Sequence, residues 1–166
     1  MEKKRSRFVM FLLVSVFLVW LDQYTKKLAV AYLKGKDAIS VWKDVFELRY
    51  LENRGAAFGM LQGKQAVFFV IALLVLAGVC YILYKMPAEK RYIPLTACLA
   101  GICSGAVGNM IDRMVNGYVV DFLYFSLIDF PIFNVADIYV TVATACLVIL
   151  VLFYYKDEEF QFLSKK

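Results

Sequence analysis

Residues 66–84 carry no charged side chain, and this run constrains the fold more than any other feature of the sequence. At a rise of ~1.5 Å per residue it makes a helix about 28 Å long, close to the roughly 30 Å hydrocarbon thickness of a bilayer. The composition agrees, because 62% of the residues are hydrophobic, whereas soluble domains are roughly 45–50% apolar. We therefore expect an integral membrane protein.

Three further segments, residues 8–28, 95–112 and 135–155, have the length and low charge of membrane spans. The last carries a single charge, Asp137, near its start. The first is less regular, because its apolar run meets charged residues between positions 22 and 27. It still fits a span with a polar outer turn. The sequence predicts a mainly α-helical protein with four transmembrane helices in one domain, residues 1–166.

The first segment also has features of a cleavable signal peptide. Basic residues precede it, and residues 29–31 have the Ala-x-Ala form of a cleavage site. The charges at positions 22–27 oppose this interpretation, because they fall between the apolar core and the supposed cleavage site. We expect the segment to be retained as a membrane span.

The distribution of basic residues predicts the orientation. Lysines and arginines occupy positions 3, 4, 5 and 7 and recur in the short loop of residues 85–91. Short basic flanks of spans stay in the cytoplasm. We expect both termini to be cytoplasmic, with residues 35–63 and 114–133 on the outer side.

The outer segment of residues 35–63 contains a strand signal. Apolar and charged side chains alternate over residues 45–51, which places Phe46, Leu48 and Tyr50 on one face. This period of two is typical of a half-buried β-strand. A second apolar stretch, residues 119–125, can pair with it. We expect a small extracytoplasmic β-sheet subdomain between the first two spans.

Composition excludes several kinds of chemistry. The chain has no histidine, which removes catalytic groups built on histidine and metal sites that need imidazole. Its four cysteines lie in apolar runs without a Cys-x-x-Cys pair, so we expect neither a zinc site nor a disulfide framework. The net charge of +5 is explained by basic residues that flank spans. We therefore expect no nucleic-acid partner.

Five aspartates lie at or near the predicted outer ends of spans: Asp22, Asp112, Asp121, Asp129 and Asp137. Ionisable groups at membrane depth are costly and usually functional. Asp22 has Lys26 one helical turn away, and Asp112 precedes Arg113, so structural ion pairing is the alternative for both acids. Asp129 stands in a loop, where solvation alone would explain it.

Asp121 and Asp137 have only uncharged neighbours in the sequence. Two carboxyl groups brought together in a partly dry site share a proton, so that one acts as a base and the other as an acid. Such a pair can activate water against an amide carbonyl. The spacing leaves other roles open, namely a helix cap for Asp137 and a hydrogen-bonded loop carboxylate for Asp121.

Small and amide side chains add a further signal. The third predicted span contains Gly101, Gly105 and Gly108, and such residues let another helix approach closely. Asparagines stand in or beside apolar sequence at positions 53, 109 and 134. Their amides can orient carboxylates or hold a peptide backbone.

Five blocks of this sequence, in order, resemble the lipoprotein signal peptidase (signal peptidase II) family of bacterial membrane enzymes. They are residues 22–26 (Asp-Gln-Tyr-Thr-Lys), 53–59 (Asn-Arg-Gly-Ala-Ala-Phe-Gly), 108–113 (Gly-Asn-Met-Ile-Asp-Arg), 120–122 (Val-Asp-Phe) and 133–137 (Phe-Asn-Val-Ala-Asp). Each block is weak alone, but five in this order on a four-span chain are specific. The resemblance covers nearly the whole chain.

The resemblance implies an aspartic endopeptidase in which Asp121 and Asp137 are the catalytic pair. It implies that Asp22 and Lys26 support the shape of the site. Further residues are implied to bind substrate or support the pair: Asn53, Gly55, Asn109, Arg113 and Asn134.

The resemblance also implies the substrate and the location. Such an enzyme removes the signal peptide from a diacylglyceryl-modified prolipoprotein by aspartate-activated water, cutting before the lipidated cysteine. It needs no metal or other cofactor. The implied location is the bacterial cytoplasmic membrane, with the site near the extracytoplasmic face and with lipidated signal peptides and membrane lipids as partners. We expect a monomer.

Three other functions fit parts of the sequence. A proton-coupled carrier could use Asp22, Lys26 and Asp137 as relay groups, but it would need deep charges and repeat symmetry, which the sequence lacks. A non-catalytic scaffold would use the acids only as helix caps. A serine–lysine hydrolase would use Ser104, which lies at least one helical turn below the predicted outer face.

Overall fold

The structure is a computed structural model in which residues 2–55 and 64–164 are described. It contains the long helices α1 (Glu2–Leu33), α2 (Gln65–Lys85), α3 (Ile93–Asn116) and α4 (Val135–Ile149). A π-helical turn, Leu150–Tyr154, continues α4. Within the described residues, four helical segments are long and apolar enough to cross a membrane. The predicted four-span architecture is therefore confirmed.

The helix boundaries differ from the predicted spans. α1 does not stop near residue 28 but continues to Leu33, because Asp22 and Lys26 are buried partners inside the helix. α3 extends to Asn116, beyond the predicted end at residue 112. It ends at Gly117, which has the left-handed φ of 78° that favours glycine. This turn directs the chain into the strand that carries Asp121.

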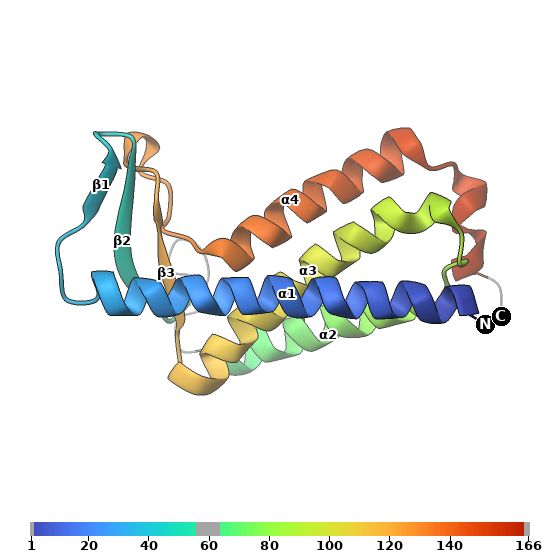
Figure 1. Ribbon diagram of the computed structural model, residues 1–166, viewed down its shortest axis with the longest axis horizontal. Coiled ribbons are helices and arrows are strands. Elements are labelled where there is room, and N and C mark those ends of the chain that lie inside the picture. Colours follow the sequence, from blue (N-terminus) through green and yellow to red (C-terminus); the bar gives the residue numbers. More distant parts are fainter. Residues whose placement is uncertain (1, 56–63, 165–166) are drawn as a thin grey trace.

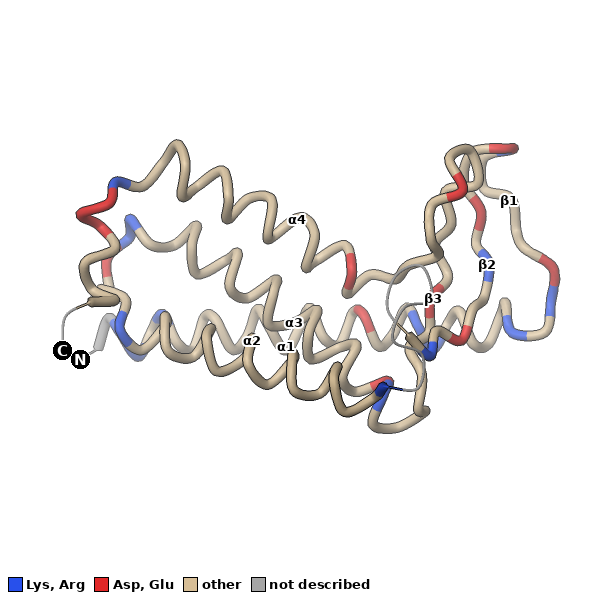
Figure 2. The backbone as a smooth tube through the Cα atoms, turned by 180° about the vertical axis from the view of Figure 1, so that it is seen from behind, with Lys and Arg blue, Asp and Glu red and all other residues tan. Residues whose placement is uncertain are grey.

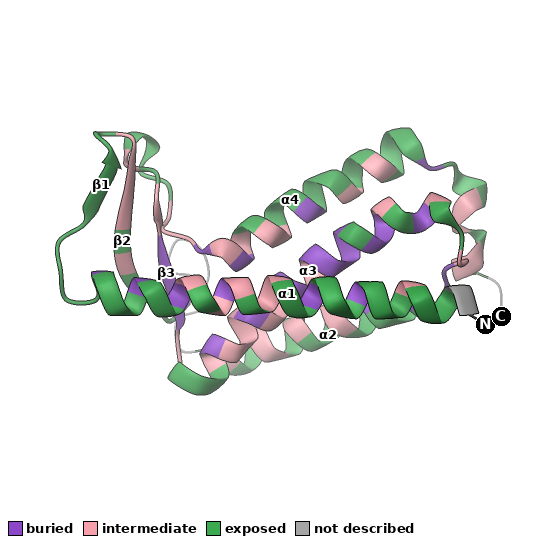
Figure 3. Cartoon of the chain, viewed as in Figure 1, coloured by how far each residue is buried: buried purple, intermediate pink, exposed green. Residues whose placement is uncertain are grey.

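α3 is the central helix of the bundle. It packs against α1, α2 and α4, and it is the most buried of the four spans (Figure 3). The other three helices expose apolar side chains on their outer faces. Such exposure is expected where helices face lipid, because the hydrocarbon core is as apolar as the side chains.

The glycines of α3 allow the close packing that the sequence predicts. A Cβ atom at Gly105 would lie 2.5 Å from the Ala136 carbonyl oxygen of α4. A Cβ atom at Gly108 would lie 2.5 Å from Oδ2 of Asp22 on α1. Larger residues at these positions would push α1 and α4 away from α3, so the glycines set the distances at the polar end of the bundle.

A three-stranded antiparallel sheet caps the end of the bundle opposite the termini (Figure 1). Its order is β1 (Ile39–Trp42), β2 (Phe46–Asn53) and β3 (Val119–Tyr124). β2 and β3 correspond to the predicted strands and pair with each other. The sheet therefore draws on both outer segments, and β1 is an addition that the sequence did not predict.

The predicted buried face of β2 is confirmed for Leu48 and Tyr50. Both side chains pack against a cluster that includes Leu33 of α1 and Phe122 of β3. The β2–β3 register shifts between Leu48 and Leu51. This irregularity is followed by the part of the ladder that contains Asp121.

Both termini lie at the other end of the bundle (Figure 1), as an even number of spans requires. Here a short 3₁₀ helix, Asp157–Leu163, follows the last span. The Tyr92 and Tyr155 rings stack 5.8 Å apart, and Arg91 pairs with Glu159 at 2.8 Å. Together these contacts connect the loop before α3 to the C-terminal segment.

Candidate active site

A cavity of about 870 Å³ lies at the sheet end of the bundle, between α2, α3 and α4. Its polar residues include Asn53 of β2, Asn109 and Arg113 of α3, Asp121 of β3 and Asp137 of α4. Apolar side chains form the remaining wall, among them Phe68, Ile132, Phe133, Ile138 and Val142. The cavity thus combines a polar region with a large apolar surface.

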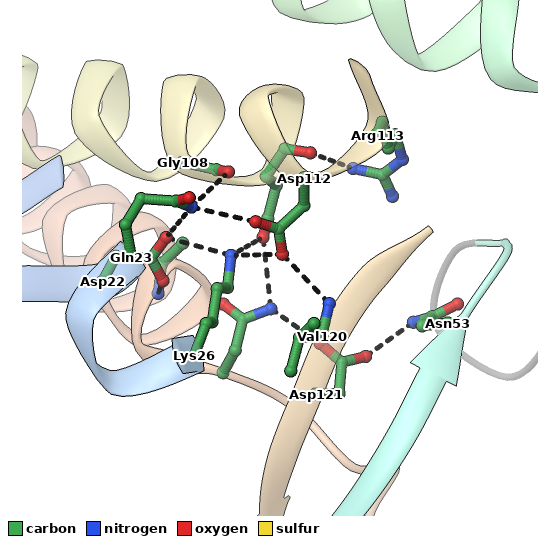
Figure 4. Close-up of polar contacts among 12 residues, drawn as sticks. Asp22, Gln23, Lys26, Asn53, Gly108, Asp112, Arg113, Val120 and Asp121 are labelled. Carbon is green, nitrogen blue, oxygen red and sulfur yellow. Dashed lines mark hydrogen bonds and ion pairs between the residues drawn. The ribbon is translucent and has the colours of Figure 1, made fainter. Parts of the chain in front are cut away.

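Asp121 lies on β3 with only 1% of its surface exposed. The amide nitrogen of Asn53 donates to its Oδ2 at 2.8 Å (Figure 4). The amide nitrogen of Asn134 donates to its Oδ1 at 2.6 Å. No lysine or arginine among the described residues forms an ion pair with it. The charge of Asp121 is therefore held by neutral donors.

The environment of Asp121 favours its protonated form. Burial away from water raises the pKa of Asp121 to about 7 from an ordinary value of 3.8, and the amide donated by Asn53 opposes this shift. The negative charge of Asp137 raises the pKa further. Near neutral pH, this carboxyl can both hold and release a proton.

Asp137 lies in the first turn of α4, where Asn134 is the N-cap residue. The side chain of Asn134 accepts from the Asp137 backbone N–H at 3.1 Å, and Oδ2 of Asp137 accepts from the Asn134 backbone N–H at 3.1 Å. The helix-cap alternative for Asp137 is thus confirmed as a local role. Its Oδ1 also accepts from the Asn109 amide at 2.8 Å, and the residue lines the cavity.

Asn134 connects the two carboxyl groups. It is fully buried, donates its amide to Asp121 and accepts the backbone N–H of Asp137. Its amide also contacts Oδ1 of Asn109 at 3.1 Å. Asp121 and Asp137 therefore face one cavity and share Asn134 as a neutral hydrogen-bonding partner.

Behind the cavity, Lys26 forms the centre of a buried ion-paired cluster. Its Nζ lies 2.9 Å from Oδ2 of Asp22 and 3.1 Å from Oδ2 of Asp112 (Figure 4). It also donates to Oδ1 of Asn109 at 2.9 Å. None of the three charged residues is more than 3% exposed. The predicted Asp22–Lys26 pair is confirmed, and ion pairing accounts for Asp112 as well.

The acids of this cluster also accept backbone donors from the active-site elements. Oδ1 of Asp22 accepts from the Ala136 N–H of α4 at 3.0 Å. Oδ2 of Asp112 accepts from the Val120 N–H of β3 at 3.0 Å. Each contact lies one residue before a cavity aspartate, so the cluster fixes the positions of both Asp121 and Asp137.

Gln23 belongs to this network, although we did not predict a role for it. Its amide contacts Oδ2 of Asp22 at 3.1 Å, the Gly108 carbonyl at 3.1 Å and Oδ1 of Asp112 at 2.9 Å. The available signal was its place inside the first family-like block, residues 22–26. Gln23 connects α1 to α3 at the point where Gly108 permits close approach.

Arg113 does not pair with the neighbouring Asp112, which was the partner considered from the sequence. Adjacent side chains on a helix diverge, and Asp112 instead contacts Lys26. The Arg113 guanidinium lies 4.2 Å from the Phe68 ring centre and donates to the Gly55 carbonyl at 3.2 Å. Positions 56–59 of the second family-like block lie outside the described residues.

Two other candidate residues lie outside the cavity lining. Asp129 is exposed and accepts the Tyr124 hydroxyl at 2.6 Å, in agreement with its interpretation as a solvated loop acid. Ser104 is fully buried, and its hydroxyl donates to the Ala100 carbonyl at 2.6 Å. These contacts give Ser104 a helix-packing role.

Comparisons with known proteins agree with this geometry. The model of the family described as signal peptidase (SPase) II matches residues 14–153. A lipoprotein signal peptidase of Caldanaerobacter subterraneus subsp. tengcongensis is 45% identical over 145 residues, which cover 87% of this chain and 97% of the relative. One from Brevibacillus brevis is 41% identical and covers 82% and 91%, respectively.

Solved structures show the same architecture. Two bacterial membrane enzymes, solved at 2.3 and 1.9 Å resolution, each give a TM-score of 0.75, with 32% and 31% sequence identity. The first match covers 86% of this chain and 87% of the other chain. The second covers 88% and 94%, respectively.

Proposed function

The chain belongs to the signal peptidase II family, and we propose that it is an aspartic endopeptidase that removes signal peptides from diacylglyceryl-modified prolipoproteins. Its four membrane-capable helices fit a multi-pass protein of the bacterial inner membrane. The observation that carries the aspartic mechanism is that Asp121 and Asp137 lie in one cavity, are joined through Asn134, and form no ion pair with any described lysine or arginine.

In this mechanism, Asp121 is the member of the pair that carries the proton at rest, since its pKa is raised to about 7. Asp137, as a carboxylate, removes a proton from a water molecule that attacks the scissile carbonyl carbon. The Asp121 carboxyl donates its proton to the carbonyl oxygen. When the tetrahedral intermediate collapses, the C–N bond breaks and the proton on Asp137 passes to the leaving amine, while a hydroxyl proton of the intermediate returns to the Asp121 carboxylate.

Amide side chains give this pair its reactivity. Asn53 and Asn134 stabilise ionised Asp121 without neutralising it, and Asn109 does the same for Asp137. A lysine in direct contact would favour the doubly ionised state, which has no proton to donate. The amide donors instead leave one proton available to the pair.

The apolar part of the cavity suits a lipidated substrate. Phe68 of α2 and Val142 of α4 stand on different helices around the cavity. A signal helix and the acyl chains of a modified cysteine are themselves apolar, so they can occupy this wall while the scissile bond reaches the carboxyl groups. Arg113 and Gly55 lie where a peptide backbone would pass.

We further propose that the site faces the extracytoplasmic side and that both termini are cytoplasmic. The cavity is lined in part by residues of β2 and β3, and the sheet lies at the end of the bundle opposite the termini (Figure 1). The basic flanks near the termini support this orientation under the positive-inside rule. We also propose that the protein acts as a monomer.

The test is cleavage of a diacylglyceryl-modified prolipoprotein by the purified chain in detergent, beside its Asp137→Asn variant and an unlipidated substrate. We expect the wild type to cut only the lipidated form and the variant to lose cleavage while staying folded. Asparagine keeps an oxygen that can accept the Asn134 N–H, so the helix cap is preserved. Equal cutting by the variant would refute the proposed pair, and equal cutting of both substrates would refute the lipid requirement.

A further inference from the structure

A second groove of about 370 Å³ lies at the opposite end of the bundle, between the start of α1 and the end of α2. Three of its lining residues are cationic, namely Lys4, Arg5 and Arg7. The others are Phe8, Cys80, Leu83 and Tyr84. Within the described part of the chain, no acidic side chain lines this groove.

Arg7 is fixed in place by the end of α2. Its guanidinium donates to the Leu83 carbonyl at 2.9 Å, to the Met86 carbonyl at 3.0 Å and to the Pro87 carbonyl. These carbonyls lie at the C-terminal end of α2, where a positive charge is favourable, and the Arg7 guanidinium caps them. They are neutral, so the charge of Arg7 is not cancelled, and a guanidinium has more N–H donors than these contacts use.

None of the acidic side chains that the structure describes at this end lines the groove. Glu159 accepts from Arg91 at 2.8 Å and from the Lys156 backbone N–H at 2.9 Å. Figure 2 shows basic positions at the start of α1, close to the chain termini. The groove therefore presents positive charge that the described residues do not balance.

The apolar part of the groove continues onto lipid-facing surface. The side chain of Phe8 is 51% exposed and that of Tyr84 is 78% exposed, and both stand on helices that cross the membrane. A ligand with a charged head and an apolar tail would place the head near Lys4 and Arg5 and the tail along these rings. Aromatic residues at such a level are typical of the membrane interface.

We propose that this groove binds one anionic phospholipid, with its phosphate against Lys4, Arg5 and Arg7 and an acyl chain along Phe8 and Tyr84. Charge complementarity selects this occupant. A zwitterionic lipid brings its own positive group, and the basic flank of a signal peptide would be repelled. Basic pockets between membrane helices bind anionic headgroups in this way.

The experiment is native mass spectrometry of the purified full chain, titrated with phosphatidylglycerol or with phosphatidylcholine of the same acyl chains. Each basic residue near an anionic lipid contributes about a fivefold gain in binding. We expect the wild type to prefer phosphatidylglycerol. We also expect the double variant Lys4→Gln/Arg5→Gln, which keeps the Arg7 contacts, to lose about 25-fold of that preference.

The matched control is Lys36→Gln/Lys43→Gln, which removes the same charge from two exposed residues at the sheet end. We expect it to bind like the wild type. A second variant, Cys80→Trp, fills the apolar part of the groove without changing charge and should weaken phosphatidylglycerol binding severalfold. The proposal is overturned if the wild type shows no preference, if the control loses as much as the groove variant, or if Cys80→Trp binds normally.

Discussion

Two groups of aspartates lie side by side at the sheet end and differ in what holds them. Asp22 and Asp112 form the ion-paired cluster with Lys26. Asp121 and Asp137 form an amide-held pair, whose hydrogen-bond donors are asparagine amides and a backbone N–H. The first group is held by one buried cation and is structural. The two carboxyl groups of the second cannot both ionise at low cost, so they share a proton, and proton transfer requires such a proton.

Asn109 separates these two environments. Its carbonyl oxygen accepts from Lys26, while its amide nitrogen donates to Asp137. The cation is therefore one amide away from the pair rather than in contact with it. This arrangement lets Lys26 fix the geometry of the site without forcing both cavity carboxyl groups to ionise.

The largest expected effect comes from replacing one acid of each group. One replacement should mainly reduce the cleavage rate, and the other should mainly reduce the stability of the fold. For Asp121→Asn we expect about a thousandfold loss of cleavage with only a modest change in unfolding, because a pKa of about 7 leaves this carboxyl largely uncharged below neutral pH. For Asp112→Asn we expect a clear loss of stability, because Lys26 loses a carboxylate partner. Cleavage rates and denaturant unfolding in the same detergent measure both effects. Near-normal cleavage by Asp121→Asn would contradict the assignment.

Removal of the shared cation should break the ion-paired cluster. Lys26→Met leaves two buried carboxylates without a counter-charge, so we expect a loss of about 3–5 kcal/mol in the free energy of unfolding. The control is Lys27→Met, one position along on an exposed side chain, where a change within about 0.5 kcal/mol is expected. Similar unfolding curves for the two variants would show that the cluster does not hold the helices together.

Asn134→Ala should weaken the amide-held pair by a smaller amount. The variant loses the N-cap bond of α4, which is worth about 1–2 kcal/mol, and one donor to Asp121. Because that donor lowers the pKa of Asp121, we expect the pKa to rise further. Unfolding and the pH dependence of cleavage are the measurements, with Asn116→Ala, at an exposed residue, as the control. A pH profile that shifts downward would oppose the proposed donor role.

The pH dependence of stability and of cleavage should report on the proton held by the amide-held pair. Asp121 has a folded-state pKa of about 7, above its ordinary 3.8. Its contribution to stability is therefore complete below about pH 3.8 and is lost as the pH rises through 7. Cleavage that needs the shared proton should fall about tenfold per pH unit above 7. A rate that stays level well into the alkaline range would show that no proton on Asp121 is required.

The bundle was predictable from the sequence because uncharged runs fix the number of spans. The helix ends were less predictable. The charges at Asp22 and Lys26 looked like the end of a span, but their partner Asp112 comes from a distant helix. Only the folded arrangement shows that these charges are internal. β1 was missed because it is an exposed edge strand with no buried face to impose alternation.

The site was predicted less by spacing than by resemblance. Spacing alone left helix capping open for Asp137, and the capping bonds are indeed present. Asn134 is both the N-cap residue of α4 and the link between the two cavity acids, since it contacts Asp121 and Asp137 through different atoms. A sequence contains no direct sign of such a contact, because Asp121 reaches Asn134 through the bridge between Leu123 of β3 and Phe133, the residue before Asn134.

The most direct test of the difference between the two groups is an infrared pH titration of the carboxylic-acid C=O band in purified protein. We predict a protonated carboxyl that titrates near pH 7 in the wild type, disappears in Asp121→Asn and persists in a folded Asp112→Asn sample. If the band is unchanged in Asp121→Asn, or disappears only with Asp112, the amide-held pair does not hold the proton and the proposed mechanism is wrong.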